Sequence, residues 1–374
     1  MKVLSTLAIN SYSISVCFLG IVSPVYAVSL SKTDNYFTTE NTLSSAISSV
    51  EGQLENENVD FYNFSNLDTG NLFTVEVDSQ SFDPLLGQLD DFGNIIAIND
   101  DQSDRNVLPI LTGEIPTSGS LNFAVSGLRD IFLRGDHFES GSYTFSLKTF
   151  PFPSPSTNVT LANSGFESGN FTGWTTLGST SIETTTFGSG STEGNFQALL
   201  STGGATFDGS IIEKFLVLED NSLNNFDGEE VIKGSAIQQQ FTAKSGDILS
   251  FDWNFLTNEV LPPVTFSDFS FVSISSSDNS VSSLLELADV TDTTSEFSLT
   301  DFFQETGFGT FSLKLPTTAT YTLGLGVIDV GDNDFDSGLL VDNFKLTSVP
   351  EPTNELGLLG FSTLVLLRFW RKIL

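Results

Sequence analysis

The chain has 374 residues and a formal charge of −33, with acidic side chains spread along its whole length. Such a surface repels nucleic acid and anionic lipid, so neither is an expected partner, whereas it suits divalent cations. Hydrophobic residues make up 39% of the chain, 35 residues are Phe, and Ser, Thr, Gly, Asn and Asp fill the intervals. This composition excludes a disordered chain and favours short strands joined by turns.

The N-terminus, MKVLSTLAINSYSISVCFLGIVSPVYA, has the features of a secretory signal peptide. Lys2 supplies a positive charge, residues 14–22 are mostly apolar, and small or neutral side chains precede the expected cleavage point after Ala27. An uncleaved anchor is the alternative, but the apolar run falls short of the roughly 20 residues that span a bilayer. We therefore expect signal peptidase to remove residues 1–27. Cys17, the only cysteine, would leave with them, so the exported protein would hold no disulfide.

Residues 38–150 are expected to form the first of two antiparallel β-sandwiches. In NLFTVEVDS the apolar side chains of Phe73, Val75 and Val77 fall on one face, and SYTFSLKTF alternates in the same way. VDFYNFSN, LLGQLDDFG, NIIAIND and SLNFAVSG are further strand candidates, and turn residues separate nearly all of them. Six or more short strands at this spacing predict a sandwich.

Acidic side chains cluster in the stretch FDPLLGQLDDFGNIIAINDDQSDR of this segment. The stretch resembles the bacterial pre-peptidase C-terminal domain, an accessory module of secreted proteins with no catalytic residues of its own. The resemblance implies a strand, a hairpin and a return strand whose carboxylates converge, where a hard cation such as Ca²⁺ finds several oxygen ligands. The expected calcium ligands are Asp83, Asp90, Asn94, Asp100 and Asp101. Plain turn chemistry is the alternative, because Asp and Asn favour hairpin tips.

Three prolines in residues 151–157, PFPSPST, predict a stiff linker before a second sandwich over residues 158–347. This segment opens with LANSGFESGNFTGW and ends with LLVDNFKL, and it resembles the jelly-roll sandwiches of carbohydrate-binding modules. The resemblance places its first and last strands side by side, with Phe166 and Phe344 in the core. Glu167 and Asp342 would then meet at one edge and share a Ca²⁺. Two solvated carboxylates on edge strands are the alternative.

Trp174 and Trp253 are the only tryptophans outside the C-terminal tail. Sugar-binding modules commonly stack a pyranose on an exposed aromatic ring. Trp174 follows Gly173 at a core position of the jelly-roll pattern, and Trp253 shares a strand face with Phe251 and Phe255. Both rings are therefore expected to be buried, which weakens the prediction of sugar binding through them.

No residue is predicted to be catalytic. His137 is the only histidine, and it lies in LRGDHFESG between Asp136 and Glu139, where we expect a surface turn. One histidine and no retained cysteine exclude the usual zinc sites and Ser/His/Asp or Cys/His triads. Asp and Glu are so numerous that a glycosidase-like carboxylate pair has no diagnostic value here.

The C-terminus combines a Pro-Glu-Pro, an apolar stretch over residues 356–367 and a final cluster of positive charge. The order is Pro350, Glu351 and Pro352, and then Arg368, Arg371 and Lys372 after the apolar stretch. Residues 349–374 resemble the PEP-CTERM sorting signal of Gram-negative bacteria. The resemblance implies a short transmembrane helix with its positive end inside, transient membrane insertion, and cleavage by an exosortase.

The expected protein is thus an all-β chain of two jelly-roll-like sandwiches, exported and sorted to the cell surface or extracellular matrix. The leading interpretation is a non-enzymatic surface protein whose sandwiches are stabilised by calcium. A protein that binds extracellular polysaccharide is the second interpretation, and an envelope-associated hydrolase is the third.

Overall fold

The computed structural model describes residues 48–102, 106–154, 160–227, 230–259, 267–293, 297–331 and 335–348. The predicted signal peptide with Ala27 and the predicted sorting segment, from Pro350 to Lys372, lie outside these ranges. Within them, no helix is both long and apolar enough to cross a membrane.

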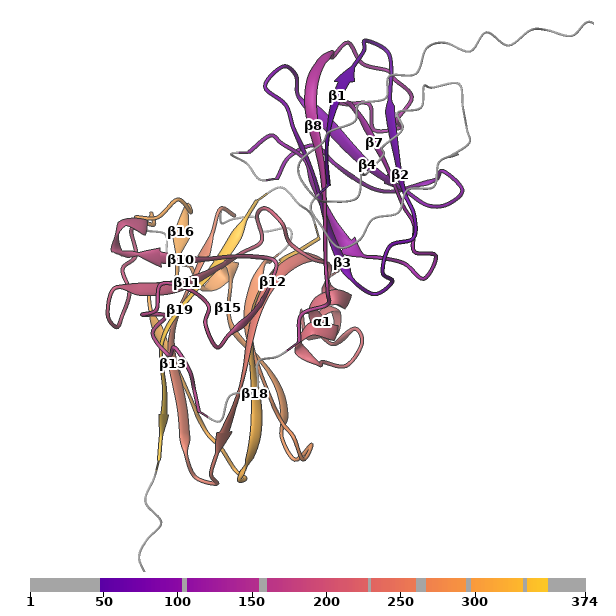
Figure 1. The fold of residues 1–374 in the computed structure, drawn as a ribbon. Coiled ribbons are helices and arrows are strands. Elements are labelled where there is room, and N and C mark those ends of the chain that lie inside the picture. The colour runs from indigo at the N-terminus through magenta and orange to yellow at the C-terminus, as the bar shows by residue number, and fades with distance from the viewer. Residues whose placement is uncertain are drawn as a thin grey trace, which may run out of the picture.

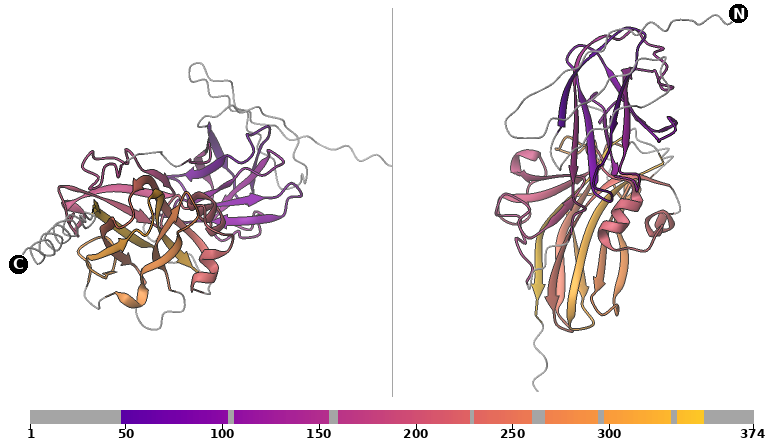
Figure 2. Two further views of the ribbon diagram at one scale, coloured as in Figure 1. Left: turned by 90° about the horizontal axis from the view of Figure 1, so that it is seen from below. Right: turned by 45° about the vertical axis from the view of Figure 1, so that its right-hand side comes forward.

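The described chain is all-β, as predicted, and each of its strand pairings is antiparallel. Two groups of sheets follow one another in the sequence and lie end to end (Figures 1 and 2). The first group, here the N-terminal sandwich, pairs its strands in the orders β1-β8-β3-β6 and β2-β7-β4-β5. Its strands are β1 (Ser48–Leu54), β2 (Asp60–Phe64), β3 (Leu72–Asp78), β4 (Pro84–Leu89), β5 (Ile95–Asn99), β6 (Ile110–Glu114), β7 (Leu121–Gly127) and β8 (Gly141–Phe150).

Period-two alternation builds the core of the N-terminal sandwich. Phe73, Val75 and Val77 of β3 are at most 1% exposed, which confirms the face predicted for this strand. Tyr143, Phe145 and Leu147 of β8 are equally buried, and the rings of Phe145 and Tyr62 stack with centroids 4.3 Å apart. Burial of side chains of this size stabilises the fold by about 1.5–3 kcal/mol each.

The second group, here the C-terminal sandwich, has a six-stranded sheet, β10-β11-β19-β13-β16 with β17 also on β13, and a five-stranded sheet, β15-β14-β18-β12-β9. Its strands are β9 (Thr175–Leu177), β10 (Ser179–Thr184), β11 (Phe196–Ser201), β12 (Val231–Ala243), β13 (Ile248–Thr257), β14 (Phe269–Ser276), β15 (Ser282–Asp289), β16 (Gln304–Glu305), β17 (Gly309–Lys314), β18 (Ala319–Val330) and β19 (Ser337–Thr347). Short helical elements are η1 (Thr185–Phe187), α1 (Gly209–Leu216), α2 (Ser222–Asp227) and η2 (Val290–Asp292).

The predicted first strand of the C-terminal sandwich is not a strand. The backbone around Phe166 forms consecutive turns, because Asn163 and Phe166 take positive φ values of 46° and 56°. The segment nevertheless lies beside β19, since the backbone N–H of Phe344 donates to the carbonyl of Ser164 at 2.8 Å. Phe166, Phe344 and Trp174 are all buried and in mutual ring contact, so their predicted core positions are confirmed.

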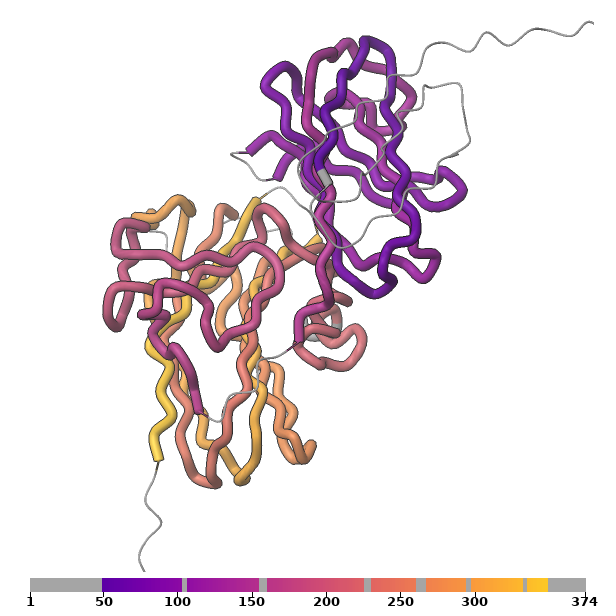
Figure 3. The backbone as a smooth tube through the Cα atoms, in the orientation of Figure 1, coloured from indigo at the N-terminus to yellow at the C-terminus, as the bar shows by residue number. Residues whose placement is uncertain are grey.

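Helix α1 lies at the junction of the two sandwiches, directly beside the chain that leaves β8 (Figures 1 and 3). It begins where the side chain of Asp208 accepts the N–H of Ile211, a typical N-cap. Its apolar face, including Ile212, packs in a cluster that also holds Leu72 of the N-terminal sandwich. The helix therefore ties the two sandwiches together through buried apolar contacts.

Candidate functional site

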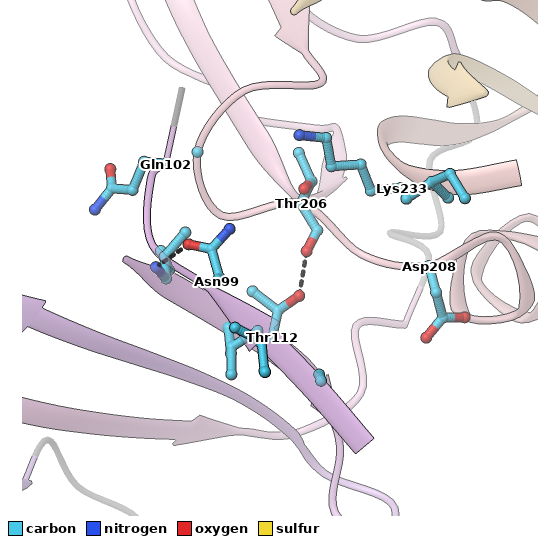
Figure 4. A pocket seen from close by; sticks show the side chains of 12 residues that line it. Asn99, Gln102, Thr112, Thr206, Asp208 and Lys233 are labelled. Carbon is cyan, nitrogen blue, oxygen red and sulfur yellow. Dashed lines mark hydrogen bonds between the residues drawn. The ribbon is translucent and has the colours of Figure 1, made fainter. Parts of the chain in front are cut away.

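A cavity of about 330 Å³ lies between the two sandwiches (Figure 4). We call it the inter-sandwich cleft. It is lined by Ala97, Ile98, Asn99, Gln102, Ile110, Leu111 and Thr112 on one wall, and by Gly204, Thr206, Asp208, Ile232 and Lys233 on the other. Its size falls at the lower end of the range for small-molecule sites, about 300–1,000 Å³, and such sites favour the interfaces between folded units.

The N-terminal wall of the cleft is built from β5, β6 and the residues after β5. Asn99 ends β5, and its side-chain oxygen accepts the backbone N–H of Ile110 at 2.9 Å, which fixes the two strand ends against each other. Gln102 is held by the side-chain amide of Asn106 at 2.8 Å. The amide side chains of this wall therefore have defined positions.

The C-terminal wall comes from the loop before α1 and from the start of β12. The hydroxyl of Thr112 donates to the carbonyl of Thr206 across the cleft, and Gly204 donates its N–H to the carbonyl of Gln102 at 3.1 Å. Lys233 enters from β12, and its Nζ lies 3.4 Å from the carboxylate of Asp329. The walls are thus joined directly by hydrogen bonds.

Further contacts between the sandwiches hold the cleft at a fixed width. Lys214 of α1 forms an ion pair with Glu114 at 2.7 Å, and the same ammonium lies 4.4 Å from the centre of the Phe152 ring. The apolar cluster around α1 adds buried area beneath these polar contacts. A cleft bounded in this way is organised before a ligand arrives, which lowers the entropic cost of binding.

The lining combines two amides, two hydroxyls, one carboxylate and one ammonium with aliphatic side chains. Lys233 already has an anionic partner in Asp329, so the lining offers no spare positive charge to an anionic ligand. The cleft therefore suits a neutral ligand that is rich in hydroxyl groups and has apolar C–H faces.

Glu167 and Asp342, the carboxylates predicted to share a cation, both hold the loop that precedes β11. Glu167 accepts the backbone N–H groups of Asn195 and Phe196 at 2.8 and 3.0 Å, and these bonds lower the pKa of its carboxyl. Asp342, fully buried, accepts those of Thr192 and Glu193 at 2.8 and 2.9 Å. Desolvation raises the pKa of Asp342, although these N–H donors oppose the effect.

Gly165 lies close to these carboxylates and to that of Glu193, which fills the space that a side chain would take. A Cβ atom placed on Gly165 would lie 2.4 Å from Oε2 of Glu193 and 3.6 Å from Oδ1 of Asp342. The same position is 3.6 Å from Cγ of Glu167. We call Gly165, Glu167, Glu193 and Asp342 the acidic cradle. Sequence reasoning found two of its carboxylates and missed Glu193, which reaches the cradle from a loop with no recognisable ligand spacing.

The acidic residues predicted as ligands in the N-terminal sandwich separate into two places. Asp90 and Asn94 form a self-contained turn, because Asp90 accepts the N–H groups of Phe92 and Asn94 and the side-chain amide of Asn94, each at 2.8 Å. The Asn94 amide is the main reason that the pKa of Asp90 is lowered.

Asp83 lies apart from that turn, at the start of β4. Burial raises the pKa of its carboxyl, and the nearby charges of Asp100 and Glu139 raise it further. Asp101 follows Asp100 at the surface, immediately after β5. Across the described ranges, no group of three or more His, Cys, Asp or Glu side chains is arranged to hold a metal ion.

His137 is 5% exposed, so the predicted surface position is wrong. Its Nε2 lies 2.7 Å from the carbonyl of Asn58, and its Nδ1 accepts the N–H of Glu139 at 3.1 Å. The ring thus bridges two backbone segments. The charged neighbours Asp136 and Glu139 suggested exposure, whereas a contact with the carbonyl of Asn58, remote in sequence, explains the burial.

Trp174 is buried, as predicted, whereas Trp253 is only partly buried. A bulge between Ser250 and Asp252 interrupts the pairing of β13 with β19 just before Trp253. The indole of Trp253 lies against Gly309, where a Cβ would come within 3.0 Å of the ring. The indole of Trp253 therefore packs over Gly309 at the margin of the core and is not enclosed within it.

No family model matches the sequence, and no curated protein matches it. Several solved structures resemble it in part. TmCBM61, a carbohydrate-binding module solved with β-1,4-galactotriose, has 13% identity and a TM-score of 0.31, with 52% of this chain and all of that chain covered. The CBM22-1–CBM22-2 tandem of Paenibacillus barcinonensis Xyn10C has 10% identity and a TM-score of 0.27, with 92% and 93% covered.

The lysozyme inhibitor PliG of Aeromonas hydrophila has 14% identity and a TM-score of 0.24, with 30% of this chain and 94% of that chain covered. These similar structures thus include carbohydrate-binding modules and a protein of a different function. Likenesses at this level carry no inference about the ligand of this chain.

Proposed function

We propose that this protein is an exported, non-catalytic protein that binds a neutral polysaccharide in the inter-sandwich cleft. The cleft itself carries the proposal, because polar side chains of both sandwiches line one cavity there. Asn99, Gln102 and Asp208 supply donors and acceptors for sugar hydroxyls, and Ile98 and Ile232 supply surface for sugar C–H groups.

The charge of the protein selects among polysaccharides. A net charge of −33 repels uronic-acid polymers, and the ammonium in the cleft is already paired with Asp329. A neutral glycan meets neither obstacle. The volume of about 330 Å³ suits a short stretch of a chain, so affinity for a single sugar unit would be weak and would grow with the number of units.

Binding, not catalysis, fits the groups that the cleft contains. His137 is used up by backbone contacts away from the cleft, and the cleft brings one carboxylate, Asp208, to its lining. Glycoside hydrolysis ordinarily needs a pair of carboxylates on either side of the scissile bond.

Affinity electrophoresis tests the proposal. The full chain is run through native gels that contain β-glucan, xylan, galactan or mannan, with alginate as the anionic comparison. We expect retardation by at least one neutral polymer and none by alginate. Retardation by alginate alone, or by no polymer, would contradict the proposal.

Two variants locate the site. Ala97→Trp fills the cleft with a bulky ring, so it should abolish retardation, and Gln102→Ala removes one hydrogen-bonding side chain, which should weaken binding about 5- to 10-fold. Ser49→Trp and Gln53→Ala are matched controls on β1, the edge of the sheet opposite to β6. Unchanged retardation in Ala97→Trp would place the sugar elsewhere.

A second part of the proposal concerns calcium. Glu167 and Asp342 would hold a Ca²⁺ beside Gly165, and Glu193 would have to move to join them, because no three acidic side chains of the described residues already stand together as metal ligands. The ion would supply charge compensation and would fix the loop before β11 to the last strand. Asp83, Asp90, Asn94, Asp100 and Asp101 remain weaker candidates, because Asp90 and Asn94 bind each other.

The route of export follows from the two termini. Signal peptidase would cleave after Ala27, and an exosortase would act near Pro350, Glu351 and Pro352. Residues 38–150 and 158–347 would be the two exported domains, delivered to the cell surface or to the exopolysaccharide layer. Mass spectrometry of the protein recovered from cells and medium tests this route, because an intact C-terminus on protein outside the cell would contradict it.

A further inference from the structure

A lysine and an aspartate face each other across two buried strands of the C-terminal sandwich. Lys233 of β12 is paired directly with Asp329 of β18 in the antiparallel ladder. The Nζ atom lies 3.4 Å from Oδ2 of Asp329, whose side chain is 1% exposed, while the lysine side chain is 19% exposed. The aspartate of this pair is buried and loses most of its hydration, which offsets much of what it gains from the ammonium.

A third acidic side chain lies on the next strand. Asp268 immediately precedes β14, which pairs with β18 on the side away from β12. Asp268 is 1% exposed, and it accepts the N–H of Val330, the residue after Asp329, at 3.0 Å. Its other oxygen accepts the hydroxyl of Ser337 at 2.6 Å. Lys233 of β12, Asp329 of β18 and Asp268, just before β14, thus occupy neighbouring positions across three adjacent strands.

The protonation of Asp268 suits proton transfer near neutral pH. Burial raises the pKa of this carboxyl to about 7, against the lowering by the Ser337 hydroxyl and the Val330 amide. The charge of Glu259 raises the pKa as well, while the ammonium of Lys233 lowers it. A buried group of this kind can both give and take a proton at pH 7.

We propose that Lys233 and Asp329 condense into an intramolecular amide bond, with Asp268 as the acid–base group. The Nζ atom lies 3.4 Å from Oδ2, and a movement toward Cγ would bring it to the about 3–3.5 Å at which the two bonding atoms can react. Neighbouring strands hold the two side chains in register, so the reaction is intramolecular and needs no enzyme.

The reaction balances without any other reactant. A proton first passes from the ammonium to the Asp329 carboxylate, which gives an amine and a carboxylic acid. Nζ then attacks Cγ of Asp329 while protonated Asp268 donates to the carbonyl oxygen. The C–OH bond breaks, one water leaves, and Asp268 recovers its proton from the nitrogen. Ammonium and carboxylate have become an amide and water, with no oxidation or reduction.

The bond would give the protein a permanent cross-link between β12 and β18. The chain has a single cysteine, Cys17, so no disulfide can do this within the chain. A cross-link from residue 233 to residue 329 closes a long loop and restricts the unfolded chain, as a disulfide would.

Mass spectrometry of the full chain under denaturing conditions tests this inference. After a day at 37 °C and pH 7, we expect a mass about 18 Da below that of the sequence between the observed termini, the loss of one water. Trypsin should fail to cut after Lys233 and should yield a branched peptide that joins the segments around Lys233 and Asp329. Neither measurement depends on sugar binding, so the two proposals can fail separately.

Variants and a control define the outcome. Lys233→Arg and Asp329→Ala should restore the full mass, and Asp268→Asn should slow the mass loss at least 10-fold. Lys214→Arg is the matched control, because Lys214 has a shorter contact with Glu114, 2.7 Å, at an exposed site with side chains 50% and 34% exposed. It should keep the mass loss.

Two results would overturn the inference. One is the full mass with an unbranched Lys233 peptide, which shows an ordinary ion pair. The other is a mass loss that maps to Asp208-Gly209 or Asp227-Gly228, which shows a cyclised aspartate at an Asp-Gly step.

Discussion

The hairpin tip at Asp90 and the acidic cradle at Gly165 present carboxylates that look alike in sequence and differ in structure. Asp90 is partly exposed, and its donors come from the next four residues of its own turn. Asp342 is fully buried, and it takes two of its donors from a loop 150 and 149 residues away. The carboxylate of Asp90 orders only its own turn, whereas that of Asp342 fixes a distant loop to the last strand of the C-terminal sandwich.

The largest expected effect on stability comes from removing Asp342, the buried carboxylate. Asp342→Ala leaves the N–H groups of Thr192 and Glu193 without their acceptor, so we expect a loss of about 3 kcal/mol in the free energy of unfolding. Urea denaturation checks this value. A loss below about 1 kcal/mol, comparable to that of an average surface substitution, would show that the loop does not depend on Asp342.

The second-largest effect is expected from calcium, which should act at the acidic cradle and not at the hairpin tip. If the acidic cradle binds Ca²⁺, a concentration 100 times the dissociation constant adds about 2.7 kcal/mol to the free energy of unfolding, and chelator removes it. Gly165→Ala should abolish this response, because its Cβ would displace the flexible carboxylate of Glu193. Thermal melts with calcium and with chelator measure it.

Gly190→Ala is the control for this prediction, since its Cβ would meet only Thr185 at an ordinary 3.6 Å. It should keep the full calcium response. A response that persists in Gly165→Ala would locate the ion outside the acidic cradle.

The buried carboxyl of Asp268 extends the comparison to the pH dependence of stability. Asp268 keeps its proton up to about pH 7 in the folded protein, whereas an unfolded aspartate loses it near pH 3.8. Between these values the folded state binds more protons, so its stability should fall as pH rises, by about 1 kcal/mol per pH unit. Asp268→Asn should flatten this slope in denaturant titrations from pH 4 to 8, and an unchanged slope would assign it to another group.

The smallest effect is expected at the hairpin tip. Asp90→Asn keeps an oxygen for the turn and removes only a charge at the surface, so the melting temperature and its calcium response should both stay close to wild type. A lost calcium response in this variant would reverse the comparison, because it would place the ion in the N-terminal sandwich.

The alternation of apolar and polar side chains in the sequence predicted the strands and the faces that they bury. The strand faces at Phe73 and Tyr143 follow from a period of two. Helix α1 was not predicted, because its eight residues are too few to show a helical repeat of apolar side chains in a sequence dominated by strands. The segment at Phe166 was taken for a strand, although Asn163 and glycines bend it into turns.

The candidate site was less predictable for a physical reason. Thr112 and Thr206 meet across the inter-sandwich cleft, yet 94 residues separate them and neither belongs to a motif. Sequence spacing reports neighbours on one strand or turn, whereas the cleft depends on how two sandwiches pack through α1. Glu193 escaped notice for the same reason.

Hydrogen–deuterium exchange of the full chain, with and without a neutral oligosaccharide that retards it in gels, tests the central claim most directly. If the sugar occupies the inter-sandwich cleft, slowed exchange should appear together in residues 97–102 and 110–112 of one wall and 204–208 and 232–233 of the other. Slowed exchange confined to one sandwich, for instance to residues 297–308 of the C-terminal sandwich, would contradict it.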